Sequence, residues 1–285
     1  MQRLAFIAIL FFAVALSAAE RPRVVTSFLP LYCWTANVAG ENATVENLLP
    51  ARAEPHDYAF TPGDARRLGG AGLIVVNGLG LEPWLPKFLR GSPTSNDRVL
   101  AIGTGLGGQR ILGDAARPNP HVWLDPQLAA YGVSNLALAL QRIDPPRAAA
   151  YADNARMYLA RLDRLDHDIQ QSLAGITNRA IVTYHDAFPY FARRYGLEIA
   201  GLVEQVPDVN PTPKHLAQLS RMMRARGLRV IWVPVGGRTR LAERIAADLK
   251  VELVELDTLE TGALSPSAYE ERMRANAAVL QKHLK

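Results

Sequence analysis

Short apolar runs alternate with longer amphipathic segments along most of the chain. In the first half, the runs that predict strands are residues 23–28, 43–49, 73–77 and 99–102. Thr61, Pro62 and Asp64 are typical of a helix N-terminus, because they supply a cap, a suitable first helical residue and a negative charge. This alternation of strand and helix predicts a parallel sheet with helices on both faces.

The second half repeats the alternation. Its predicted strands are residues 180–184, 197–203, 230–233 and 251–256, and its later predicted helices are residues 214–226, 239–249 and 267–283. Between the halves, Asp144-Pro145-Pro146 begins a segment with apolar residues at helical spacing as far as Leu173. At 1.5 Å per residue this helix would span roughly 40 Å, enough to join two domains.

We therefore predict an α/β protein of two domains, each with a mainly parallel four-stranded sheet flanked by helices, joined by one long helix. The predicted divisions are an N-terminal domain at residues 20–143, a linking helix at 144–175 and a C-terminal domain at 176–285. The preceding residues, 1–19, differ from the rest. A basic start is followed by an apolar run and by Ser17-Ala18-Ala19, the pattern of a cleavable signal peptide. An uncleaved N-terminal anchor is the alternative.

Composition narrows the class of protein further. The chain is 49% hydrophobic and 21% charged, as expected of a globular protein. Cys33, its one cysteine, excludes an intramolecular disulfide and does not lie at the cleavage site, so we expect a product free in a periplasm. The formal net charge is +5, but the basic residues are scattered among acids, which argues against nucleic-acid binding.

Four polar side chains follow predicted strands. They are His56, His121, His185 and Asp257, two from each half of the chain. Ligands of open parallel sheets bind beyond the carboxyl ends of the strands, so these side chains would converge if the halves face each other. Three imidazoles and one carboxylate suit a divalent transition metal. The remaining histidines, His167, His215 and His283, lack this placement.

Several motifs resemble those of the metal-binding receptors of bacterial ABC importers, the zinc/manganese cluster of periplasmic solute-binding proteins. The motifs are Pro55-His56-Asp57-Tyr58, Asn77-Gly78-Leu79-Gly80-Leu81-Glu82-Pro83-Trp84, Asn119-Pro120-His121-Val122-Trp123-Leu124-Asp125-Pro126 and Tyr184-His185-Asp186-Ala187-Phe188. The resemblance implies two α/β domains joined by a rigid helix. It also implies metal held between them by His56, His121, His185 and Asp257, and delivery to a membrane permease driven by a separate ATPase. We expect a monomer.

Within that family, a histidine at the third ligand position resembles the zinc members and a glutamate the manganese members. His185 therefore favours Zn²⁺ as the transported ligand over Mn²⁺, in agreement with the preference of imidazole for zinc. Asp257 is followed by Thr258, where family members have proline. Glu54, Asp57 and Asp125 are candidates to orient the imidazoles. A manganese receptor and a zinc-dependent hydrolase are the alternatives, although no His-Glu-x-x-His motif is present.

Overall fold

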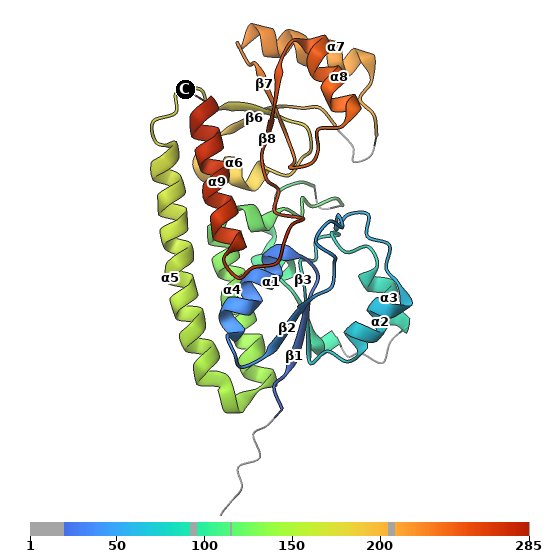
Figure 1. Cartoon of the computed structure of the whole chain (residues 1–285), viewed down its shortest axis with the longest axis vertical. Coiled ribbons are helices and arrows are strands. Elements are labelled where there is room, and N and C mark those ends of the chain that lie inside the picture. Colours follow the sequence, from blue (N-terminus) through green and yellow to red (C-terminus); the bar gives the residue numbers. More distant parts are fainter. Residues whose placement is uncertain (1–19, 92–95, 115, 205–208, 285) are drawn as a thin grey trace, which may run out of the picture.

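The computed structural model describes residues 20–91, 96–114, 116–204 and 209–284 (Figure 1). The predicted signal peptide, residues 1–19, lies outside the described residues. The strands of the first sheet are β1 Arg23–Thr26, β2 Thr44–Asn47, β3 Leu73–Val76 and β4 Val99–Ala101. Those of the second are β5 Ala180–Thr183, β6 Glu198–Leu202, β7 Val230–Val233 and β8 Glu252–Glu255. All eight correspond to strands predicted from the sequence.

The two sheets have the same topology. Their strand orders are β2-β1-β3-β4 and β6-β5-β7-β8, and every neighbouring pair is parallel. The central strands β3 and β5 are buried throughout, which explains their continuous apolar sequences. The predicted fold class, with two four-stranded parallel sheets flanked by helices, is confirmed. Because both sheets are parallel, all carboxyl ends of one sheet lie at one edge.

Helices connect and cover the strands. In the first half they are α1 Leu29–Ala39, α2 Pro62–Gly69, α3 Leu85–Gly91 and α4 Pro126–Ile143. α5 Ala148–Leu173 follows, and the second half contains α6 Pro189–Tyr195, α7 Pro213–Ala225, α8 Arg240–Leu249 and α9 Ala268–His283. At the start of α2, Thr61 and Asp64 form a reciprocal capping box, as their spacing predicts. No helix among the described residues is long and apolar enough to cross a membrane.

The predicted long helix is α5, of 26 residues, which runs beside both halves of the molecule (Figure 1). It packs against α4 and α1 of the first half and against α9, which follows the last strand. One hydrophobic core therefore continues from β1 through α5 to α9 and one face of the second sheet. A smaller core lies on the other face of that sheet, under α7 and α8. The two halves consequently share apolar packing as well as a connecting helix.

One predicted helix begins later than expected. The sequence predicts a helix from Gly80 to Leu89, whereas α3 begins at Leu85. Leu79 and Gly80 have φ of 56° and 85°, a conformation incompatible with an α-helix. The buried Glu82 carboxylate accepts hydrogen bonds from the backbone N–H groups of Asn77 and Gly78, at 2.8 and 2.9 Å, and thereby holds this turn.

Candidate metal centre

Three histidines and one glutamate meet between the two halves. They are His56, His121, His185 and Glu260, and one potential ligand atom of each lies within 4.8 Å of the corresponding atoms of the others. The first two histidines come from the N-terminal half and the other two residues from the C-terminal half. The side chains of His121 and Glu260 are almost fully buried, whereas 27% of the His56 side chain remains exposed. The group is therefore accessible from the side of His56.

The distances within this group match a tetrahedral site. His121 Nε2 lies 3.4 Å from His56 Nε2 and 3.2 Å from His185 Nε2. Glu260 Oε1 lies 2.9 Å from His56 Nε2 and 3.3 Å from His121 Nε2. Zinc–ligand bonds of about 2.0–2.1 Å in a tetrahedron place neighbouring ligand atoms about 3.3–3.4 Å apart. Four of the six ligand-atom pairs are therefore at 2.9–3.4 Å, near the spacing of a tetrahedral zinc site, and the other two pairs lie within 4.8 Å.

Two of the histidines lie in the connection that follows a strand, and the third lies before a short helix. His185 comes two residues after β5, and His56 lies in the connection from β2 to α2. His121 precedes a short 3₁₀ helix, Val122–Leu124, that leads into α4. On the far side of that 3₁₀ helix, the Asp125 side chain caps α4 by accepting a hydrogen bond from the Gln127 N–H. Asp125 is therefore a helix cap, and His121 Nδ1 contacts Asn119 Oδ1 instead.

The fourth predicted ligand, Asp257, does not belong to this group. Its carboxylate accepts hydrogen bonds from the Leu259 N–H at 2.8 Å and from the Arg272 guanidinium at 3.2 Å. Leu259 has a φ of 62°, so the Asp257 carboxylate supports a tight left-handed turn immediately before Glu260. In the structure Asp257 shapes the loop, and Glu260 is the carboxylate that lies with the three histidines.

Sequence reasoning missed Glu260. Two signals were present, since Glu260 lies in the same loop after the last strand and is an acidic residue three positions beyond Asp257. Neither signal reveals that the chain turns sharply between the two acids.

The protonation states also suit cation binding. Burial alone would raise the pKa of the Glu260 carboxyl, but hydrogen bonds and charge from His121 and His56 hold it below its usual range. Burial, together with repulsion from His121, lowers the pKa of His185 to about 4. Burial would lower the pKa of His56, but the Glu260 carboxylate beside it raises it overall. At neutral pH the group therefore contains an ionised carboxylate and, at His185, a neutral imidazole with a free lone pair.

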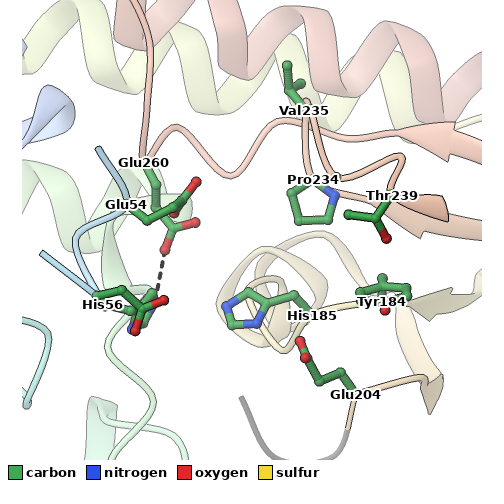
Figure 2. A pocket seen from close by; sticks show the side chains of 12 residues that line it. Glu54, His56, Tyr184, His185, Glu204, Pro234, Val235, Thr239 and Glu260 are labelled. Carbon is green, nitrogen blue, oxygen red and sulfur yellow. Dashed lines mark hydrogen bonds and ion pairs between the residues drawn. The ribbon is translucent and has the colours of Figure 1, made fainter. Parts of the chain in front are cut away.

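A cavity of about 330 Å³ opens beside the group. Figure 2 shows Glu54, His56 and Glu260 on one side and His185, Tyr184 and Glu204 on the other. Asp57 also lines this cavity. The lining is thus rich in carboxylates, which raises the local concentration of cations. Glu54 and Asp57, proposed from sequence as imidazole-orienting residues, line this approach to the group.

The chain has two α/β halves, each with a parallel β-sheet, and a group of three histidines and one glutamate lies between them. This combination defines a metal-binding solute receptor. The comparison with known families agrees: the chain belongs to the family described as zinc-uptake complex component A, periplasmic, whose profile matches residues 24–283. Members of this family are metal-binding transport proteins that work with an ABC transporter, and they are not enzymes.

Individual relatives are similar over most of the chain. The high-affinity zinc uptake system protein ZnuA of Bacillus subtilis is 27% identical over 256 residues, covering 86% of this chain and 80% of that protein. The zinc-binding lipoprotein AdcA of Streptococcus pneumoniae is 29% identical over 92% of this chain, which spans only 54% of AdcA. Among solved structures, the solute-binding protein FpvC of Pseudomonas aeruginosa in complex with Ni²⁺ is 28% identical. That alignment has a TM-score of 0.82 and covers 93% of this chain and 97% of FpvC.

Proposed function

We propose that this chain is the periplasmic receptor of a zinc importer and that it binds one Zn²⁺ ion through His56, His121, His185 and Glu260. The observation that carries this proposal is the convergence of the four potential ligand atoms, all within 4.8 Å of one another and four of the six pairs at 2.9–3.4 Å. Four protein ligands fill a tetrahedral coordination sphere, whereas catalytic zinc keeps one position for water or substrate. A filled site suits a protein that holds its metal and later releases it unchanged.

The ligand types favour zinc. Imidazole nitrogen suits Zn²⁺, whereas Mn²⁺ prefers sites richer in oxygen ligands. The names of ZnuA and AdcA support the same choice. FpvC, with a similar fold, has been solved in complex with Ni²⁺ and with Mn²⁺, so the metal must be established by direct titration.

The surroundings of the group support capture and delivery. The carboxylate-lined cavity draws cations toward His56, whose side chain is 27% exposed. We propose that residues 1–19 export the chain and are then removed. The loaded receptor, a monomer, would transfer its ion to the membrane permease of an ABC importer that is driven by a separate ATPase.

The first experiment is calorimetric titration of the chelator-stripped chain, beginning at Glu20, with Zn²⁺ and separately with Mn²⁺. The expected result is one Zn²⁺ per chain with submicromolar affinity and much weaker binding of Mn²⁺. Comparable or tighter binding of Mn²⁺ would overturn the assignment of the metal. If neither ion binds, the His₃Glu group is not a metal site.

A pair of isosteric variants then tests the fourth ligand. Glu260→Gln removes the negative charge from the group and should weaken Zn²⁺ binding by at least about a hundredfold, the upper limit of the loss seen when a residue that only supports a ligand is changed. Asp257→Asn is the matched control, because its Oδ1 can still accept the Leu259 N–H. This variant loses the Arg272 contact but keeps Glu260 in the group, so it should weaken Zn²⁺ binding less than Glu260→Gln does. A larger loss in Asp257→Asn than in Glu260→Gln would restore Asp257 as the ligand.

A further inference from the structure

One amide side chain contacts both halves of the molecule beside the metal centre. Asn119 is 8% exposed and lies two residues before His121. Its Oδ1 accepts hydrogen bonds from the backbone N–H of His121 at 3.0 Å and contacts Nδ1 of the same imidazole at 2.9 Å. Its Nδ2 donates to the backbone carbonyl of Asp186 at 2.8 Å and to the Asp186 carboxylate at 3.1 Å.

The chemistry of these partners determines the orientation of the amide. A backbone N–H can only donate, so the atom that faces the His121 N–H must be the Asn119 oxygen. The two oxygens of Asp186 accept, so the atom that faces them must be the Asn119 nitrogen. Both ends of the amide therefore require the same orientation, and a flipped amide would place donor against donor and acceptor against acceptor.

This orientation determines how His121 is protonated. Because Asn119 Oδ1 is an acceptor, the imidazole nitrogen beside it, Nδ1, must carry the hydrogen. The other nitrogen, Nε2, then has the free lone pair. Nε2 is also the atom of His121 that faces His56, His185 and Glu260. The amide thus selects the tautomer that can bind a metal inside the group.

The backbone of Asn119 is held as well. Its carbonyl accepts a hydrogen bond from the Tyr190 hydroxyl at 2.7 Å, and its N–H donates to the Leu112 carbonyl at 2.7 Å. Tyr190 belongs to α6, and Asp186 immediately follows His185. Asn119 therefore joins the segment that carries one ligand to the segment that carries another, across the boundary between the two halves.

We propose that Asn119 is a positioning residue for metal binding: it fixes His121 in the Nε2-binding tautomer and ties that ligand to the His185 segment of the opposite half. This inference rests on the proposed function, since it assigns a role within the same metal centre. Residues that orient metal-ligating imidazoles in this way contribute about 10–100-fold to metal affinity.

Three variants separate the two contacts of the amide. Asn119→Ala removes both and should weaken Zn²⁺ binding by about 10–100-fold in calorimetry. Asp186→Ala is the matched control, because it leaves the Asp186 carbonyl for Asn119 Nδ2 and all contacts of Oδ1 to His121. It should stay within about threefold of the wild type. Asn119→Asp combined with Asp186→Ala keeps an acceptor for His121 and removes the carboxylate that would repel it. The Asp186 carbonyl still faces the new carboxylate, so affinity should recover in part, to a value between those of Asn119→Ala and Asp186→Ala.

A spectroscopic readout distinguishes positioning from simple loss of stability. Bound Co²⁺ has visible absorption bands that depend on the geometry of its ligands, so Asn119→Ala should alter these bands while Asp186→Ala leaves them unchanged. Unaltered affinity and an unaltered Co²⁺ spectrum in Asn119→Ala would overturn the proposal.

Equal losses of affinity in Asn119→Ala and in the double variant would also overturn it. Should Asn119→Ala fail to fold, the double variant decides alone: a loss of about a hundredfold or more relative to Asp186→Ala, the full loss expected of a missing positioning residue, contradicts the role of the oxygen. Failure of the wild type to bind Zn²⁺ would instead refute the proposed function, so the two failures are distinguishable.

Discussion

Asp166 offers a quantitative test of how the linking helix is fixed to the rest of the molecule. It lies in α5, is 5% exposed and accepts hydrogen bonds from three residues of neighbouring helices. Arg194 Nε donates at 2.9 Å, with a second contact from the same guanidinium, and the Tyr195 hydroxyl donates at 3.0 Å. Gln127 Nε2 of α4 donates at 3.0 Å. This carboxylate therefore joins α5 to α4 and to α6.

We expect Asp166→Ala to lower the free energy of unfolding by about 2–4 kcal/mol. Removing one partner of a buried ion pair typically costs about 3–5 kcal/mol. The Arg194 side chain is 35% exposed and can regain water, which reduces this cost to about 1 kcal/mol, as for an exposed pair. The Tyr195 hydroxyl is buried and would lose its partner, which adds about 1–3 kcal/mol to what remains. The change should appear in urea unfolding of the metal-free chain at neutral pH.

Asp168→Ala on the same helix is the matched control. The Asp168 side chain is 44% exposed and pairs with Arg274 at 3.0 Å, so its loss should cost less than about 1 kcal/mol. If Asp166→Ala costs no more than this control, the ion pair does not contribute as argued.

The dependence of this effect on pH provides a second check. Burial would raise the pKa of the Asp166 carboxyl, but the hydrogen bonds and charge of Arg194, with Gln127 and Tyr195, lower it below its ordinary value of 3.8. Since the folded-state pKa is the lower one, the stabilisation is fully present above about pH 4–5 and is lost as the pH falls through the lowered value. The difference between wild type and Asp166→Ala should therefore be constant at neutral pH and shrink only under strongly acidic conditions.

Three further predictions concern the site, the cysteine and the core. The pKa of His56 is raised above its ordinary value of 6.5, so protons compete with the metal for this imidazole and Zn²⁺ affinity measured by calorimetry should fall markedly below about pH 6; unchanged affinity at about pH 5 would contradict His56 as a ligand. Burial raises the pKa of Cys33 to about 12, so the native chain should not react with a thiol reagent at mildly alkaline pH but should react once denatured; rapid reaction of the native chain would contradict the burial. Trp123 is fully buried, donates to the Thr258 carbonyl at 2.8 Å and packs edge-on against Phe28, so Trp123→Ala should cost about 3–5 kcal/mol in urea unfolding, and a cost below about 1 kcal/mol would contradict this packing.

Much of the fold could be predicted because local sequence and burial agree. β3 and β5 are apolar throughout and lie at the centre of their sheets, so their sequence pattern reports their position directly. α3 was less predictable, because its start depends on the buried Glu82 carboxylate holding the preceding backbone in a turn. A contact of this kind between a side chain and a neighbouring turn is not visible in hydrophobic periodicity. The predicted domain divisions stay a prediction, although the shared core across α5 and α9 joins the halves closely.

The sequence by itself determined the two parallel sheets and the place of His56, His121 and His185 after strands, because parallel strands present their carboxyl ends at one edge. That the two edges face each other, so that the three histidines meet, was decided by the tertiary structure. Only the tertiary structure decided which carboxylate joins them. Asp257 and Glu260 are three residues apart in one loop, and both are acidic. The left-handed turn at Leu259, held by Asp257 and Arg272, directs Glu260 to the histidines and leaves Asp257 behind it. That choice depends on the conformation of a single residue and on a partner in α9, and neither follows from the order of residue types along the chain.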